Sequence, residues 1–364
     1  MSKAQLRPEL LALLQLSAPS ASEIEFEAIL RSLPAAFNWN YFLERAIATN
    51  LAGYLLPYPE IAEKYYPTQI YHKIKSYQQR ILLHSVQLLE LVKTLHKALD
   101  EQLIDHAILK GCSLLIRKEA NPKKRQVSDI DLLIDPTKQK EVVALLERIG
   151  AHVKSFIYKS EWHQNQQLEH APIQAVFMGL SLDIHTRLFR SDKSYEISTS
   201  QLLANVVYYD FEDQKIPLLA DHQAQLFTIL HAHKHLYYGN AFKVGSINDL
   251  FLLNWHELKP HAEKWNAAQA FEEMELFANT WFKQHYTHSF NGKTALRFVS
   301  SRKMTLVEKS IFLYRRLTAT SRYILHPKQH FFNLFPTKTY LNHYFGKGVY
   351  LAVWWRRMKN LFRF

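Results

Sequence analysis

The stretch Leu109-Lys110-Gly111-Cys112-Ser113, with Ser128-Asp129-Ile130-Asp131-Leu132-Leu133-Ile134-Asp135 after a basic loop, decides the fold of this chain. Side chains alternate along a strand, so Asp129 and Asp131 are predicted to share one face. Two carboxylates that close repel each other unless a cation lies between them. A glycine turn ahead of such a strand can bring backbone N–H groups close to a phosphate. The pattern favours a cation and phosphate site over two solvated acids at a strand end.

The composition is that of a chain with a substantial core. Its 364 residues are 48% hydrophobic, and no apolar run approaches the ~20 residues that cross a bilayer. A single cysteine, Cys112, excludes an intramolecular disulfide and a cysteine-rich zinc site. We therefore expect a cytoplasmic protein, with two or three domains.

The net charge of +12 belongs to the C-terminal part alone. Residues 301–364 hold 13 Lys and Arg against one acid, and the remainder holds 32 of each sign. Tryptophan, phenylalanine and leucine alternate with arginine over 340–364. This tail fits an anionic membrane surface at the inner face, single-stranded nucleic acid, or a terminal helix docked on its own protein. All three interpretations stay open.

Hydrophobic spacing predicts an α+β fold, a small mixed β-sheet core flanked by N-terminal and C-terminal helical regions. Helical patterns cover 8–32, 39–56 and 70–102, and helical periodicity returns from 218. The mixed part between them has strands at 106–109 and 129–134, a helix at 113–118, and a hairpin of 173–177 with 180–185. The domains expected are 1–100 (N-terminal helical), 101–215 (α/β core), 216–335 (C-terminal helical) and 336–364 (basic aromatic tail).

Asp183 is the best candidate for a third carboxylate. It lies in Leu180-Ser181-Leu182-Asp183-Ile184-His185, a strand pattern in which Asp183 and His185 face the same way. A site for two cations needs a further ligand near the attacking hydroxyl, which Asp183 would supply. His185 is equally explained as a hydrogen-bonded strand histidine.

Other polar residues near the strand carry both a functional and a structural interpretation. Lys110 could bind a phosphate, or it could be a solvated lysine at the end of a strand. Arg125 could neutralise a triphosphate, or it could belong to a solvent-exposed basic loop. Cys112 is better explained as a small buried side chain than as a nucleophile. His231, His233 and His235 resemble a metal site at first, but only His231 and His235 share a helix face and no HExxH motif is present.

The segment LKGCSLLIRKEANPKKRQVSDIDLLID resembles the core of the uncharacterised nucleotidyltransferase family, within the DNA polymerase β-like nucleotidyltransferase superfamily. Leu182-Asp183-Ile184-His185 is similar to the family's later strand. Weaker helical similarities include Leu230 to His235 and Asn248-Asp249-Leu250. Superfamily members usually carry Gly-Gly or Gly-Ser where this chain has Gly111-Cys112. Lys234 and Asp249 could line a cleft facing the nucleotide, while helix capping or a salt bridge explains Asp249 equally well.

The resemblance implies the fold, the chemistry and a set of roles. It implies transfer of an NMP group from an NTP such as ATP to a hydroxyl of an unknown acceptor (a small molecule, protein or nucleic acid), with pyrophosphate release and two Mg²⁺ or Mn²⁺ ions. The implied catalytic and metal ligands are Asp129, Asp131 and Asp183. The implied nucleotide and phosphate contacts are Lys110, Gly111, Ser113, Arg125, His185 and Lys234. The alternative is a degenerate, non-catalytic binding protein of this fold that acts at a membrane or on nucleic acid through its basic tail.

Overall fold

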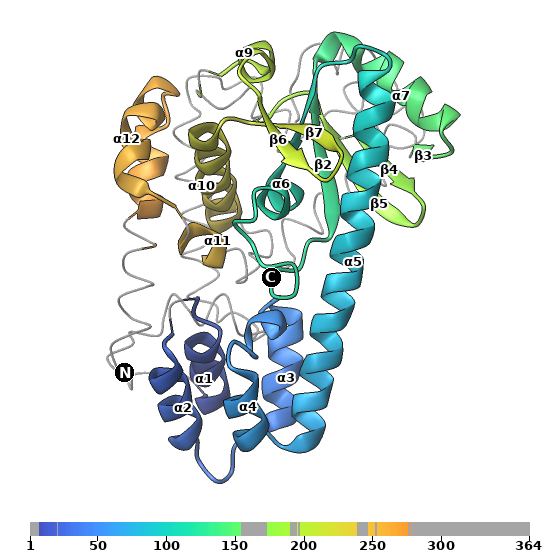
Figure 1. The fold of residues 1–364 in the computed structure, drawn as a ribbon. Helices are drawn as coiled ribbons and strands as arrows, with labels where there is room; N and C mark the ends of the chain where they lie inside the picture. The colour runs from blue at the N-terminus through green and yellow to red at the C-terminus, as the bar shows by residue number, and fades with distance from the viewer. Residues whose placement is uncertain are drawn as a thin grey trace, which may run out of the picture. The chain divides into compact units, whose positions relative to one another are not determined.

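The acidic strand predicted from the sequence lies at the centre of a seven-stranded sheet in the computed structural model (Figure 1). The strand order among the described residues is β3-β4-β5-β2-β1-β7-β6. β2 pairs parallel with β5 on one side and antiparallel with β1 on the other. Its residues Ile130, Leu132, Leu133 and Ile134 are completely buried, as expected for a central strand.

The structure describes residues 7–19, 21–153, 173–189, 195, 197–238, 247–251, 253–275 and 278. Their helices and strands are α1 (Pro8–Leu16), α2 (Glu23–Arg31), α3 (Trp39–Ala48), η1 (Ala52–Tyr54), α4 (Pro59–Tyr65), α5 (Thr68–Asp100), β1 (His106–Leu109), α6 (Lys110–Ile116), β2 (Asp129–Ile134), η2 (Pro136–Lys138), α7 (Gln139–Arg148), β3 (His152–Val153), β4 (Ile173–Phe177), β5 (Leu180–His185), α9 (Thr199–Ala204), β6 (Val207–Phe211), β7 (Gln214–Leu218), α10 (Asp221–Tyr238), α11 (Ile247–Phe251) and α12 (Trp255–Lys264).

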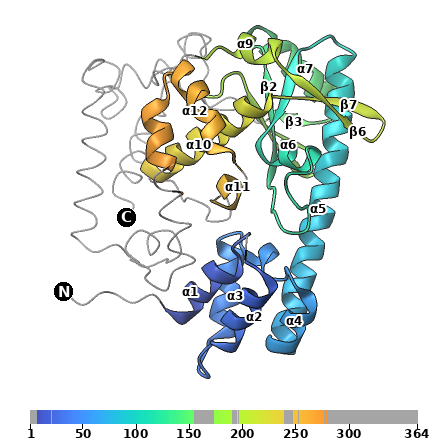
Figure 2. The ribbon, with the colours of Figure 1, turned by 60° about the vertical axis from the view of Figure 1, so that its left-hand side comes forward.

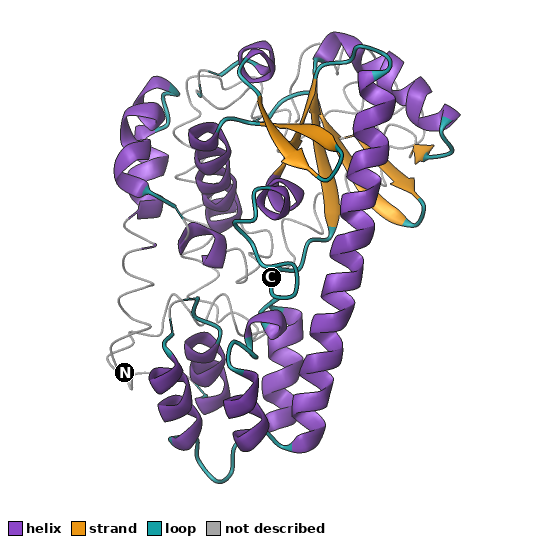
Figure 3. Ribbon diagram, in the orientation of Figure 1, coloured by secondary structure: helices purple, strands orange, loops and turns teal. Residues whose placement is uncertain are grey.

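These elements confirm the predicted fold class, a mixed sheet with helices on either side of it in the chain (Figure 3). The basic tail 336–364 lies outside the described residues, so its predicted contacts with a membrane or a nucleic acid stay predictions. The predicted domain boundaries also stay predictions. None of the described helices is long and apolar enough to cross a membrane.

The two faces of the central strands have different neighbours. Ala107 and Leu109 of β1 and Leu133 of β2 pack in one apolar cluster with α9, α10 and α12. Asp131 is the register partner of Leu109 and alternates with Ile130 and Leu132, so its side chain lies on this same face. The alternate residues of β2 point to the opposite face, where α5 contacts β2. The predicted carboxylates are therefore on the side of the sheet that carries α10 (Figure 2).

The N-terminal helices form a second apolar cluster around Phe26, Phe42 and Ile74, each completely buried. The 33-residue helix α5 contacts α3, α4 and η1 as well as α6, α7, β2 and β7. Its observed span, Thr68–Asp100, confirms the helix predicted over 70–102. The hydrophobic spacing succeeded because one face of the helix packs along its whole length, from Ile70 to Leu99.

The sequence patterns left the hairpin of β6 and β7 unassigned; it extends the sheet as far as Leu218, and the predicted return of helices follows at α10, from Asp221. Its turn is closed by Glu212 at φ 54°, a conformation that tight turns favour and that carries no glycine signal here. The helix predicted at 113–118 begins earlier, at Lys110, directly after β1.

A buried histidine pair joins α5 to β1 and makes a prediction about acid stability. Nδ1 of His106 lies 2.8 Å from the carbonyl oxygen of Ile104, and its Nε2 lies 3.0 Å from Nδ1 of His96. A carbonyl only accepts, so Nδ1 of His106 carries the proton and Nε2 accepts from His96. Burial lowers the pKa of His106 to about 4, and protonation would remove this acceptor.

The expected result is a loss of stability in mild acid. An unfolded histidine titrates near pH ~6.5, so the native state binds fewer protons than the unfolded state between that pH and about 4. The free energy of unfolding should therefore be intact above pH ~6.5 and fall by about 3 kcal/mol as the pH drops through this window. Urea unfolding at several pH values should show a flatter profile for His106→Gln than for the wild type or for the exposed-site control His152→Gln. Equal slopes in all three proteins would contradict the assignment.

Candidate active site

The site is formed by the register of two parallel strands. β2 pairs with β5 so that Asp131 lies opposite Asp183 and Leu133 lies opposite His185. Asp131, Asp183 and His185 each offer an atom to a group whose members lie within 4.8 Å of one another. No other group of at least three such side chains with metal-compatible spacing occurs among the described residues. The pairing of Asp183 and His185 with the Asp-x-Asp strand, expected from the sequence, is therefore present in the fold.

Asp131 is the centre of this group and is almost completely buried. Its Oδ1 accepts from Nζ of Lys110 at 2.5 Å and from Nε2 of His185 at 2.7 Å. Burial alone would raise the pKa of Asp131, but the hydrogen bond from His185 and the charge of Lys110 outweigh it and lower that pKa to about 2. Asp131 is consequently negatively charged at neutral pH, and its Oδ1 accepts hydrogen bonds from both Lys110 and His185.

Asp183 and Asp129 complete a set of three carboxylates. Burial and the charges of Asp131 and Asp129 raise the pKa of Asp183. Asp129 accepts from the Ser128 hydroxyl at 2.9 Å and lies outside the 4.8 Å group. Nε2 of Gln174, the register partner of Asp183 on β4, lies 3.4 Å from Asp183 Oδ1. Gln174 was not singled out from the sequence, although the predicted hairpin of 173–177 with 180–185 and its two-residue turn imply this register.

The donor set fits a hard divalent cation. Carboxylate oxygens are the ligands that Mg²⁺ and Mn²⁺ prefer. Burial first, and then the charges of Asp131 and Asp129, raise the pKa of Asp183, and a bound cation would relieve the repulsion among these carboxylates. Both hydrogen bonds to Asp131 fall on Oδ1, so its Oδ2 is the oxygen left for a cation. Nε2 of His185 donates to Asp131 and orients that carboxylate, as outer-shell partners of metal ligands commonly do.

The turn between β1 and α6 brings Lys110 to Asp131 at a conformational cost. Lys110 has φ 49°, in the left-handed region that costs a residue with a Cβ about 1–3 kcal/mol. Its side chain remains 24% exposed, so the ammonium group is reachable by a phosphate. Strained residues of this kind are commonly retained where they serve a site.

Gly111 is required for space rather than for its backbone conformation. A Cβ at this position would lie 2.7 Å from an Arg125 side-chain nitrogen and 2.7 Å from a Val127 methyl group. The turn predicted from the sequence therefore depends on Gly111 for close packing against the basic loop, while the positive φ falls on Lys110.

Replacing Gly111 with alanine should consequently be costly. Overpacking of this kind typically destabilises a protein by about 1–3 kcal/mol, and displacement of Arg125 or Val127 would move the start of α6. Gly111→Ala should lower the midpoint of thermal unfolding and also reduce activity. The exposed substitution Ser32→Ala is the control for a small change elsewhere. An unchanged unfolding midpoint for Gly111→Ala would show that Arg125 and Val127 can move aside without loss of stability, which would contradict the prediction.

Arg125 is held in a buried ion pair. Its Nε and one terminal nitrogen each lie 2.7 Å from an oxygen of Asp249 on α11, and both side chains are largely buried. Burial would lower the pKa of Arg125, but Asp249 raises it. In this geometry Arg125 faces Asp249 rather than an open phosphate site, and its predicted contact with a triphosphate stays a prediction.

The remaining predicted residues differ in what they offer. The Ser113 hydroxyl donates to the Lys110 carbonyl at 2.8 Å and is buried. Cys112 is buried, and burial raises the pKa of its thiol, which agrees with a packing role. Lys234 belongs to α10, but its side chain lies outside the described residues. Nε2 of His233 on α10 lies 2.9 Å from a carboxylate oxygen of Glu273. No sequence pattern linked these two residues, which are 40 positions apart.

An Asp-x-Asp strand paired with a strand that carries a third aspartate, beside a Lys-Gly turn, is the arrangement expected from the resemblance to nucleotidyltransferases. The chain belongs to the family described as "Uncharacterised nucleotidyltransferase", which matches residues 26–283. It is accordingly a transferase that acts on a nucleotide.

Two further comparisons complete this result. No curated protein matches the chain. The solved structure titled "Crystal Structure of ANT(2")-Ia in complex with adenylyl-2"-tobramycin" is similar to it over 54% of this chain and 98% of the other, with 15% sequence identity and a TM-score of 0.29.

Proposed function

We propose that the protein transfers an NMP group from an NTP to a hydroxyl of an acceptor and releases pyrophosphate, with a divalent cation held by Asp129, Asp131 and Asp183. The observation that carries the proposal is the register of β2 and β5, which places Asp131 opposite Asp183. A divalent cation held there would lower the pKa of an attacking hydroxyl and would neutralise charge on the pyrophosphate.

The chain's own residues would act around that cation. Lys110 bears a partly exposed ammonium group next to Asp131 and would bind a phosphate oxygen. His185 keeps Asp131 in one orientation through its hydrogen bond. Asp183, whose pKa burial raises, would accept the proton of the acceptor hydroxyl.

The test uses the full-length protein and each of the four NTPs labelled at the α-phosphate, with Mg²⁺ or Mn²⁺. Acceptors are supplied as three separate pools: small molecules, proteins and RNA. Pyrophosphate release with transfer of label to one pool, or to the protein itself, is the expected result. Pyrophosphate release in no pool, from protein that binds NTP, would contradict catalysis and favour the non-catalytic alternative.

A further inference from the structure

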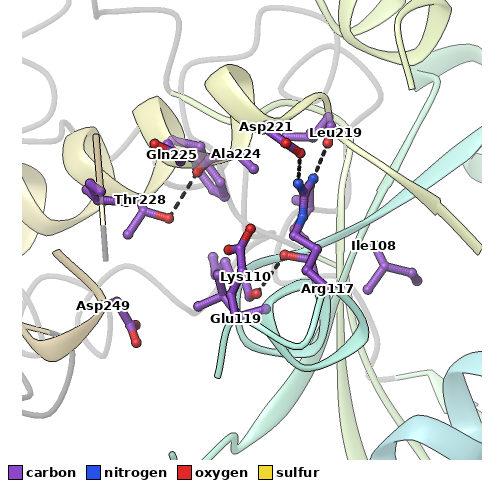
Figure 4. Close-up of a pocket in the computed structure, with 15 residues that line it drawn as sticks. Ile108, Lys110, Arg117, Glu119, Leu219, Asp221, Ala224, Gln225, Thr228 and Asp249 are labelled. Carbon is purple, nitrogen blue, oxygen red and sulfur yellow. Dashed lines mark hydrogen bonds and ion pairs between the residues drawn. The ribbon is translucent and has the colours of Figure 1, made fainter. Parts of the chain in front are cut away.

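A pocket of about 130 Å³ lies between α6 and α10, next to the carboxylate group (Figure 4). Apolar side chains form much of its wall, among them Leu114, Phe227 and Leu253. Lys110 lines the pocket as well, while its Nζ contacts Asp131 and lies 6.0 Å from the centre of the Phe227 ring. One residue therefore belongs both to the candidate site and to the pocket.

The cations that line the pocket are already neutralised. Lys110 is paired with Asp131, and Arg117 with Asp221 and with the carbonyl of Leu219. Apart from Lys110, which lies at the carboxylate group, a triphosphate in the pocket would find no unpaired positive charge among these residues. The phosphates of a substrate are better placed at the carboxylate group with its cation.

Two side chains that line the pocket, Glu119 and Gln225, carry acceptor oxygens with no hydrogen-bond donor among the described residues. Figure 4 shows the carboxylate of Glu119 extending from the end of α6 toward α10, and no hydrogen bond or ion pair holds it among the described residues. Burial raises the pKa of Glu119, with Arg117 opposing. Oε1 of Gln225 on α10 is buried without a hydrogen-bond partner in the described structure. A buried acceptor without a donor, as at Gln225, is uncommon and indicates a missing partner. Glu119 is solvent-exposed, so its carboxylate is accessible to a ligand that enters the pocket.

We infer that this pocket holds the nucleobase of the NTP, and that Glu119 and Gln225 accept hydrogen bonds from the two N–H bonds of its exocyclic amino group. The inference rests on the proposed function, which places the phosphates beside Lys110 and Asp131. The ribose then spans the short distance along Lys110 into the pocket. Apolar walls with a few acceptors suit a flat heteroaromatic ring, whereas a polyhydroxylated ligand would need more polar partners. UTP is the poorest match, because uracil has no exocyclic amino group.

The direct test is binding of ATP, CTP, GTP, UTP and inorganic tripolyphosphate to full-length protein, measured by isothermal titration calorimetry. Glu119→Gln should weaken the tightest amino-bearing NTP by about tenfold, the size expected for a lost charge-assisted hydrogen bond. It should leave UTP and tripolyphosphate unchanged. The matched control is Glu147→Gln, at an exposed position on α7. An equal loss for all five ligands, or no loss for any, would overturn the inference.

Ala224→Leu gives a second test that does not depend on Glu119. The larger side chain would enter the pocket from α10 and should abolish NTP binding while tripolyphosphate still binds. Unchanged NTP binding to this variant would place the base elsewhere. Failure of the proposed function would look different: the wild type would release no pyrophosphate, yet the selective effects of Glu119→Gln and Ala224→Leu on NTP binding would persist.

Discussion

Asp131→Asn should reduce nucleotidyl transfer by roughly three orders of magnitude, a loss comparable to the removal of a major electrostatic group from other active sites. Asp131 is the group that Lys110 and His185 both contact, and its pKa of about 2 keeps it charged at every working pH. The amide is neutral, so it would bind a divalent cation poorly and would leave Lys110 without its ion pair. Pyrophosphate release per unit of folded protein is the measurement.

The control for this prediction lies one residue beyond the end of β2. Asp135 caps the short helix η2 through Thr137, and asparagine caps equally well, so Asp135→Asn should keep full activity. A folded Asp131→Asn protein with wild-type activity would remove Asp131 from the site. A protein that fails to fold would be distinguished by its circular dichroism spectrum.

Asp249→Ala should lower the free energy of unfolding by about 3–5 kcal/mol, because it leaves the Arg125 guanidinium buried without its partner. The pair lies at a junction of distant segments. Asn248, next to Asp249, donates to the Ser17 carbonyl at 3.2 Å, and Arg125 packs against Gly111. Loss of the pair should therefore loosen α11, the basic loop and the start of α6 together.

Denaturant unfolding of three variants separates the ion pair from simple packing. The exposed substitution Asp210→Ala on β6 should have almost no effect. The double variant Arg125→Met with Asp249→Leu should be less destabilised than Asp249→Ala, since apolar pairs often replace buried ion pairs at little cost. A double variant that is at least as unstable as Asp249→Ala would mean that the shape of the pair, rather than its charge, is what the fold requires.

The helices and central strands could be predicted because their hydrophobic spacing matches their burial. α5 and β2 are examples. Apolar residues recur at helical spacing on the buried face of α5, and nearly every residue of β2 is buried. The hairpin of β6 and β7 could not be predicted, because most of β6 is solvent-exposed and shows no alternation of buried and exposed residues. The alternation of apolar and polar residues in a strand reflects burial of one face, so an edge strand that is largely exposed shows little of this alternation in its sequence.

The candidate site was predictable in its residues but not in its contacts. Asp129, Asp131, Asp183 and His185 carried a local strand pattern. The pairing of Arg125 with Asp249 and the pocket beside Glu119 join segments that are far apart in the chain. These contacts depend on strand register and tertiary packing, which local sequence does not encode.

The most direct test of the central claim is cation binding by the carboxylates on β2 and β5. Mn²⁺ titrated into full-length protein with a non-hydrolysable NTP, followed by electron paramagnetic resonance, would measure it. We predict saturable binding by the wild type and by Asp135→Asn, and an affinity at least about tenfold lower for Asp183→Asn and Asp131→Asn. Equal Mn²⁺ affinity in all four proteins would contradict the assignment of this site.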